Sequence, residues 1–200
     1  MEPSIVLFDL GGVLMPFDPE RRIAALTEFS EADPAEARAF FAFHGVQALF
    51  RKMDLGTAGL EEFAAAFGAF CGRTVSEAET KALILSVFDA PNWRLWELAH
   101  QLRGHCAVGG FSDNPRFVAE LFPDPDILQP MIFSADLGAM KPSREAFQAV
   151  EVVLGLRPDE IALVDDGPAN IIAARARGWT GWLYSGTEAL EAELRMAELL

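Results

Sequence analysis

Residues 4–14, Ser-Ile-Val-Leu-Phe-Asp-Leu-Gly-Gly-Val-Leu, carry the pattern that decides the fold. The run Ser4–Phe8 is apolar and rich in strand-forming residues, and it ends at Asp9, which Gly11 and Gly12 follow closely. A short continuous apolar run bounded by glycines is typical of a strand buried on both faces of a parallel sheet. The stretch therefore predicts a buried β-strand with a carboxylate at its carboxyl end.

The character of the chain changes between about residues 18 and 88, where alanine, phenylalanine and charged residues recur at helical spacing. Residues 33–36 and 76–79 have the form of capping boxes, and residues 56–57 precede a further periodic run. We expect three or four helices here, packed as a small bundle and inserted directly after the first strand.

From residue 92 onward, predicted helices and strands alternate. Strands joined by helices predict right-handed crossovers and a parallel sheet, so the fold class is α/β. We expect one domain from residues 1–15 and 90–200 and a helical domain from residues 16–89. The expected strands are 106–111, 131–133, 161–164 and 181–184, and the expected helices are 92–102, 115–122, 144–154, 168–177 and 188–200.

Composition excludes several classes of protein. The formal net charge is -14, with 16 basic and 30 acidic residues, so the basic surface of a nucleic-acid binder is missing. No apolar run reaches the roughly 18 residues of a membrane span, and the early motif leaves no room for a signal peptide. Cys71 and Cys106 lack metal or redox spacing. We expect a cytoplasmic protein, monomer or homodimer, with no membrane or nucleic-acid partner.

Four polar features stand at the predicted ends of successive strands. They are Asp9, the triplet Ser112–Asn114, the pair Lys141-Pro142 and the doublet Asp165-Asp166. Each alone is common in turns and helix caps. Ligands of open parallel sheets bind at the carboxyl ends of the strands, however, so together these features predict a site.

In this order the four features resemble the motifs of the haloacid dehalogenase superfamily, in the subfamily with a helical cap after the first motif. The resemblance covers nearly the whole chain, although the cap matches only in placement and helical character. It implies a Rossmann-like, doubly wound parallel sheet with strand order 5-4-1-2-3 and an inserted α-helical cap. It also implies an Mg²⁺-dependent phosphatase that acts on a small phosphorylated metabolite.

A carboxylate can attack phosphorus and form an aspartyl-phosphate, which splits hydrolysis into two easier steps. Asp9 resembles the family nucleophile. The resemblance also implies the Mg²⁺ ligands, which are Asp9, the backbone carbonyl of Gly11 and Asp166, with Asp165 acting beside them directly or through water. Asn170 would orient a metal-bound water.

The phosphate group is expected to contact Ser112, the backbone N–H of Asp113, Lys141 and Gly12. The first two residues stand where a helix is predicted to begin, which favours an anion. Lys141 would supply positive charge to the phosphate and to the crowded carboxylates.

The chain departs from most phosphatases of this family at Gly11, where they carry a second aspartate as general acid. Such acid–base help is worth about 10²–10⁴-fold. Three explanations stand open: a substrate with a good leaving group, a substitute from water or from the cap, where His44 and Arg51 are the candidates, or a slow enzyme. Some sugar-1-phosphate phosphatases of the superfamily resemble this chain in Asp-Leu-Gly, which favours the first. Candidate substrate contacts from the insertion are Phe17, His44 and Arg51.

Two other functions remain as alternatives, and a third is disfavoured by the order of the acidic residues. 2-Haloacid dehalogenases also lack the second aspartate and need no metal, and Arg21 or Arg22 could cradle their carboxylate, but the doublet Asp165-Asp166 demands a cation. A catalytically weak binding protein would leave the matching set of polar residues unexplained. A phosphorylation receiver domain would carry its acidic pair early, whereas here the pair comes late.

Overall fold

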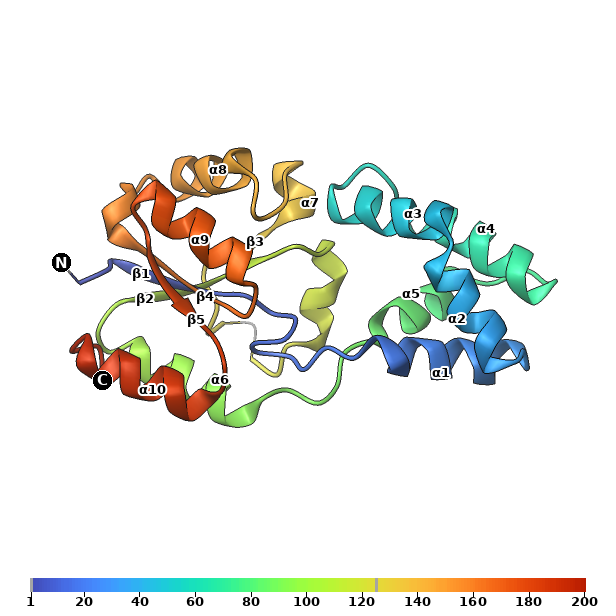
Figure 1. Cartoon of the computed structure of the whole chain (residues 1–200), viewed down its shortest axis with the longest axis horizontal. Coiled ribbons are helices and arrows are strands. Elements are labelled where there is room, and N and C mark those ends of the chain that lie inside the picture. Colours follow the sequence, from blue (N-terminus) through green and yellow to red (C-terminus); the bar gives the residue numbers. More distant parts are fainter. Residues whose placement is uncertain (1, 125) are drawn as a thin grey trace.

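The computed structural model describes residues 2–124 and 126–200, and in them five parallel strands form one sheet. The order of the strands is β3-β2-β1-β4-β5 (Figure 1). This is the expected order 5-4-1-2-3 read from the other edge, so the α/β fold is confirmed. The strands are β1 (Ile5–Phe8), β2 (Ala107–Ser112), β3 (Met131–Phe133), β4 (Ile161–Asp165) and β5 (Thr180–Leu183).

The side chains of β1 alternate between two hydrophobic cores, one on each face of the sheet. Val6 and Phe8 belong to the core beneath α6 (Trp93–Leu102) and α10 (Thr187–Met196). Ile5 and Leu7 belong to the core beneath α8 (Arg144–Leu154) and α9 (Pro168–Arg177). All four side chains are buried, and each contributes about 1.5–3 kcal/mol by leaving water. The strand that carries Asp9 is thereby held rigidly at the centre of the sheet.

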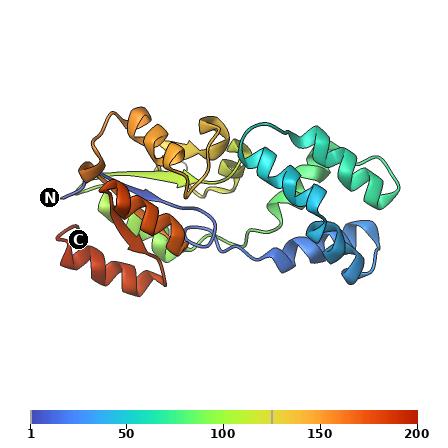
Figure 2. The same ribbon diagram turned by 45° about the horizontal axis from the view of Figure 1, so that its top comes forward.

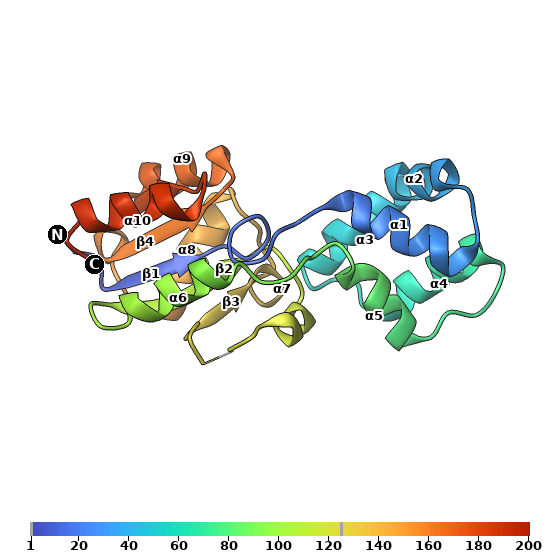
Figure 3. The same cartoon turned by 90° about the horizontal axis from the view of Figure 1, so that it is seen from below.

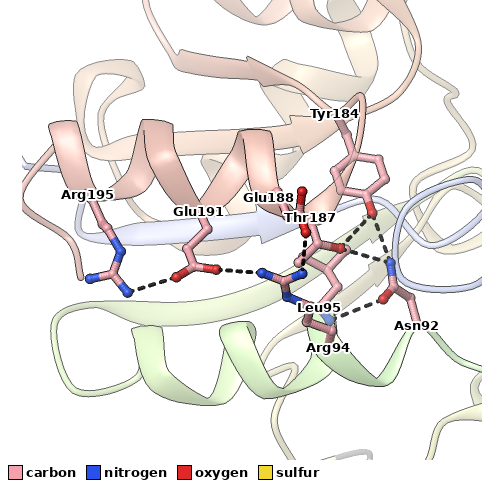
Figure 4. Close-up of polar contacts among 8 residues, drawn as sticks. All are labelled: Asn92, Arg94, Leu95, Tyr184, Thr187, Glu188, Glu191 and Arg195. Atoms are coloured by element: carbon pink, nitrogen blue, oxygen red, sulfur yellow. Dashed lines mark hydrogen bonds and ion pairs between the residues drawn. The ribbon is translucent and has the colours of Figure 1, made fainter.

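Helices α6 and α10 cover one face of the sheet side by side (Figure 4). Arg94 forms ion pairs with Glu188 and Glu191, and Asn92 donates hydrogen bonds to the hydroxyl groups of Tyr184 and Thr187. The ion pairs are exposed and each adds at most about 1 kcal/mol, so the apolar core beneath supplies most of the adhesion.

The insertion between β1 and α6 folds as a separate helical bundle, on the right in Figure 1. Within the described residues 16–89 it contains five helices rather than the three or four expected. The extra break falls at Phe43, a single extended residue that ends α2 and starts α3 without the glycine or proline that would have marked it. The helices are α1 (Pro19–Ser30), α2 (Pro34–Ala42), α3 (His44–Asp54), α4 (Leu60–Cys71) and α5 (Glu77–Leu85).

The helical insertion, residues 16–89, has a hydrophobic core of its own. Leu26, Phe63 and Phe67 are fully buried there, and the rings of Phe50 and Phe63 lie 4.6 Å apart between centroids. Most of the insertion's phenylalanines therefore stabilise the bundle itself.

Two chain segments connect the helical insertion to the sheet, and they run next to each other (Figures 2 and 3). Phe17 and Phe88 form an antiparallel bridge, the N–H of Asp18 donates to the carbonyl of Val87, and the N–H of Asp89 donates to the carbonyl of Pro16. The insertion thus departs from the sheet and returns to it through a paired, hydrogen-bonded neck.

Smaller differences from expectation concern short helices. The segment predicted as a helix at 115–122 forms a 3₁₀-helix, η1 (Arg116–Leu121), and the terminal helix α10 ends at Met196. Two short elements were not expected, α7 (Ser134–Leu137) and the 3₁₀-helix η2 (Pro158–Glu160). Helices in the described residues are all too short or too polar to cross a membrane.

Candidate active site

The carboxyl ends of β1, β2 and β4 bring the four sequence features together. Asp9 directly follows β1, where its N–H donates to the carbonyl of Val164 on β4, and Asp165 is the last residue of β4. Lys141 reaches the same place from the loop before α8. Its Nζ lies 2.6 Å from Oδ2 of Asp165 and 3.1 Å from Oδ1 of Asp9. The structure therefore joins the first, third and fourth features in one ion cluster.

The ammonium group of Lys141 is almost completely buried, with 1% of its side chain exposed. It also donates a hydrogen bond of 2.9 Å to the carbonyl of Phe111 on β2. Burial alone lowers the pKa of Lys141, but attraction to Asp9, Asp165 and Asp113 outweighs burial and raises the pKa above its ordinary value. Lys141 is therefore a permanent positive charge at the strand ends.

Asp165 is fully buried, and each of its oxygens already has a hydrogen-bond donor. Oδ2 accepts from Lys141, while Oδ1 accepts from the N–H of Gly167 at 2.7 Å and the side-chain amide of Asn170 at 2.9 Å. The side chain of Asn170 thus contacts Asp165 directly. This arrangement makes Asp165 a support that orients Lys141 and Asn170.

Asp9, Asp165 and Asp166 each offer a carboxylate oxygen, and these atoms lie within 4.8 Å of one another. Such a set of hard oxygen donors fits a cation of the Mg²⁺ or Ca²⁺ type. Asp9 and Asp166 also line the adjacent cavity, whereas the fully buried Asp165 does not. Asp9 and Asp166 are therefore the better placed of the three to hold an ion that also contacts a bound molecule.

The pKa of Asp9 is raised to about 7, chiefly by burial. Lys141 opposes this rise and Asp165 adds to it. Burial also raises the pKa of Asp166, again with a contribution from Asp165. Both carboxyl groups would be stabilised in their ionised form by a cation between them, because opposite charge at short range favours the charged state.

Gly12 is required by the close approach of its backbone to Asp166. Its φ is +78°, and a Cβ atom built on it would lie 2.1 Å from Oδ2 of Asp166. A side chain here would push the Asp166 carboxylate out of place. The second glycine of the sequence motif is thus explained by geometry, and Gly11 and Gly12 both line the cavity.

The cavity has a volume of about 420 Å³ and lies between the strand ends and the helical insertion. This falls within the ordinary size range of small-molecule sites, about 300–1,000 Å³. Its lining combines polar groups of the strand ends with apolar groups of the insertion. The lining residues are Asp9, Gly11, Gly12, Phe17, Arg22, Phe50, Met53, Asp54, Ile84, Phe88, Asp113, Asn114 and Asp166.

Asp113 lines the cavity as expected, together with its neighbour Asn114, but Ser112 does not. The Ser112 side chain is buried, and its Oγ accepts a hydrogen bond of 2.9 Å from the amide of Asn114. Asp113 accepts a hydrogen bond from the backbone N–H of Lys141, and burial raises its pKa.

Of the three substrate contacts expected from the insertion, Phe17 lines the cavity, while His44 and Arg51 have exposed side chains and are not among the lining residues. The insertion instead contributes Arg22 and Asp54, two charged side chains. Arg22 entered the sequence argument only as a cradle for a dehalogenase substrate, and Asp54 did not enter it.

Arg22 lies over the ring of Phe50, with Cζ 4.4 Å from the ring centroid, and donates to the carbonyl of Ile84. Its buried Nε has no hydrogen-bond partner within the described part of the chain. Burial lowers the pKa of Arg22 to about 10, and Asp54 opposes this effect. The guanidinium therefore stays charged at neutral pH and retains a free donor.

Asp54 is the last residue of α3 and lines the cavity from the insertion. Burial raises its pKa to about 7, the charge of Asp113 adds to the rise, and Arg22 opposes it. One signal in the sequence could have marked this residue. A carboxylate at the C-terminal end of a helix is disfavoured by the helix dipole, so an acid there invites a functional explanation.

Comparison with known proteins gives relatives over most of the chain. A D-ribitol-5-phosphate phosphatase of Bacteroides thetaiotaomicron is 28% identical over 184 residues, which cover 87% of this chain and 88% of that protein. A crystal structure of a HAD family enzyme from the same organism superposes with a TM-score of 0.85 at 22% identity, covering 96% of this chain and 99% of that one. A second structure of that enzyme, with magnesium and inorganic phosphate, gives a TM-score of 0.80 at 23% identity over 92% and 96%.

The L-2-haloacid dehalogenase of Xanthobacter autotrophicus shares the fold at a TM-score of 0.65 and 16% identity, covering 99% of this chain and 84% of that one. The fold alone thus fails to separate phosphatases from dehalogenases. Residues 3–178 match the haloacid dehalogenase-like hydrolase family. Because this match extends over most of the sequence, the chain belongs to the haloacid dehalogenase-like hydrolase family.

Proposed function

We propose that the protein is an Mg²⁺-dependent phosphatase of small phosphorylated metabolites, with sugar or sugar-alcohol phosphates as the substrate class. One observation carries the proposal: Asp9 and Asp166 line the cavity between the strand ends and the insertion, next to the buried ammonium of Lys141. The phosphatase relative and the neighbouring structure that holds magnesium and inorganic phosphate support it. We further propose that residues 16–89 act as a cap over the site.

The carboxylates of Asp9 and Asp166 and the backbone carbonyl of Gly11 would hold Mg²⁺, and Asp165 would support them through Lys141 and Asn170. Bound there, Mg²⁺ would neutralise charge on the phosphoryl oxygens.

Asp9 acts as the nucleophile. Its free carboxylate oxygen attacks phosphorus, the bond from phosphorus to the leaving oxygen breaks, and the phosphoryl group passes to Asp9 as an aspartyl-phosphate. Lys141 stabilises the ionised carboxylate before the attack and the phosphoryl oxygens after it. Water then attacks the aspartyl-phosphate and restores Asp9 with release of inorganic phosphate.

The apolar side chains of the cavity and the charge of Arg22 indicate which groups the rest of the substrate carries. Phe17, Phe50 and Phe88 surround the cavity with rings, whereas Nε of Arg22 is a buried donor that lacks an acceptor. A buried donor left without an acceptor costs about 1–3 kcal/mol, so an oxygen of the substrate that accepts from Nε gains that amount. Hydroxyl groups of a sugar or polyol supply such oxygens.

The test is phosphate release from a panel of sugar, polyol and anomeric sugar phosphates, with and without Mg²⁺. We expect turnover that needs Mg²⁺ and is abolished by Asp9→Asn. Asp159→Asn, which changes an exposed carboxylate outside the cavity, is the matched control and should keep the wild-type rate. An Asp9→Asn protein that retains its rate would refute the assignment of the nucleophile.

The same panel tests the expectation from Gly11 that anomeric phosphates turn over faster than phosphates of ordinary alcohols. Chloride release from 2-chloropropionate without Mg²⁺, in the absence of phosphatase activity, would instead identify a dehalogenase.

A further inference from the structure

One acidic side chain of the cavity has no task in the reaction described so far. The titratable residues in the described lining are Asp9, Arg22, Asp54, Asp113 and Asp166. Asp9 is the proposed nucleophile and Asp166 the proposed metal ligand. Asp113 accepts a hydrogen bond from the backbone of Lys141, and Arg22 keeps its proton at neutral pH. Asp54 remains, and it reaches the cavity from the side opposite the strand ends.

The position of Asp54 is set by contacts of its backbone with the sheet domain. The hydroxyl group of Ser134 on α7 donates a hydrogen bond of 2.5 Å to the carbonyl of Asp54. Two residues later, Gly56 has φ +70°, and a Cβ atom there would lie 2.2 Å from the carbonyl oxygen of Ala135. The end of α3 therefore rests directly on α7 (Figure 1). This contact holds the Asp54 side chain in the cavity.

A substrate that departs as an ordinary alcohol needs a proton donor at this place. The alkoxide of a sugar or polyol is a poor leaving group, and its departure is accelerated when a neighbouring acid protonates the oxygen. Gly11 supplies no acid, and on the opposite side of the cavity Asp54 does. The charged groups that face its carboxyl are Arg22 of α1 and Asp113 after β2. Burial and the charge of Asp113 raise the pKa of Asp54 to about 7, so a substantial fraction of the group carries a proton at neutral pH.

We propose that Asp54 is the general acid of the reaction and that it replaces the aspartate missing at position 11; the inference rests on the phosphatase function proposed above. As the bond between phosphorus and the leaving oxygen breaks, its electron pair stays on that oxygen, which takes the proton of Asp54 and departs as an alcohol. Asp54 is left as a carboxylate. It then accepts a proton from the water that attacks the aspartyl-phosphate, and the starting state returns.

The experiment compares two substrates whose leaving groups differ in how much they need protonation. The primary-alkyl phosphate that the wild type hydrolyses fastest requires protonation of its leaving group, whereas 4-nitrophenyl phosphate does not. Because kcat/KM reports the steps up to phosphoryl transfer, we expect Asp54→Asn to lower it about 10²–10⁴-fold for the alkyl phosphate. For 4-nitrophenyl phosphate the change should stay below about tenfold. Glu61→Gln, the same change at an exposed residue of α4, should leave both values unaltered.

Equal losses of kcat/KM for both substrates, or no loss for either, would overturn the proposal. A second measurement needs only the wild-type protein. Its kcat/KM for the alkyl phosphate should decline as pH rises above about 7, where Asp54 loses its proton, and the same decline should be missing for 4-nitrophenyl phosphate. If the two pH profiles coincide, Asp54 is not the acid. If the wild type releases phosphate from neither substrate with Mg²⁺, the proposed function itself fails.

Discussion

Replacing Lys141 with methionine removes the positive charge at the centre of the ion cluster while preserving most of the side chain's length. In the wild type, Nζ lies 2.6 Å from Asp165 and 3.1 Å from Asp9, and it donates to the carbonyl of Phe111. In the variant the two carboxylates face each other without a counter-ion, and Asp165 is fully buried. The change in the free energy of unfolding on Lys141→Met therefore measures how strongly Lys141 offsets the repulsion between the two carboxylates.

Removing one partner of a buried ion pair typically costs about 3–5 kcal/mol, because the other charge is left unsatisfied. This is a large part of the roughly 5–15 kcal/mol that stabilises an ordinary domain. The loss should depend on pH with a definite sign. Without Lys141 the pKa of Asp9, which burial already raises, rises further above its unfolded value, so the deficit is largest at pH 8 and shrinks toward pH 5 as Asp9 binds a proton.

The assay is guanidinium unfolding followed by circular dichroism at pH 8 and pH 5, without divalent cations. Lys81→Met is the matched control, since Lys81 forms an ion pair with Glu120 at the surface. A surface pair contributes about 0–1 kcal/mol, with little change between the two pH values. If Lys141→Met and Lys81→Met lose equal stability at pH 8, the buried ion cluster contributes no more to stability than a surface ion pair, and the reasoning is refuted.

Two further predictions concern the cavity. Gly12→Ala should lower kcat/KM by about 10²-fold, because its Cβ would lie 2.1 Å from Oδ2 of Asp166 and the carboxylate would have to move by about 1 Å to relieve the clash. Gly72→Ala has a similar φ of +65° with no neighbour within 4 Å, so it should lose stability alone, and equal activity losses in the two variants would contradict the steric argument. Asp54→Asn should raise the melting temperature most at pH 8 and by a smaller amount at pH 5, because the penalty of a carboxyl whose pKa rises from 3.8 to about 7 on folding grows between those two pH values. Thermal unfolding measures both temperatures, and a lower value at pH 8 would show that the ionised form is stabilising.

The sheet was accessible from the sequence because its signals are local. Each strand is a short apolar run, and its polar residue follows at the carboxyl end, as Asp9 and Asp165 show. The helix break at Phe43 was not accessible, since an extended phenylalanine between two helices is chosen by packing and has no local marker.

The polar residues at the strand ends were largely predicted, but the hydrogen bonds and ion pairs between them were not. Lys141 was expected to serve the phosphate and the carboxylates, and the structure shows its contacts with Asp9 and Asp165 in detail. Arg22 and Asp54 escaped because their importance depends on how the helical insertion rests on the sheet. Such tertiary contacts leave no periodic signature along the chain.

The paired neck at Phe17 and Phe88 makes the insertion a detour that begins and ends at nearly the same point. The two paired segments connect to the sheet in the same way whatever helices lie between them. The position of Asp9 therefore does not depend on the helices of the insertion. The length or content of the bundle can change while Asp9, Lys141 and Asp165 keep their positions at the strand ends. Changes in the helical insertion can therefore alter the substrate contacts and the proton donor at Asp54 while the nucleophile at the strand end stays in place.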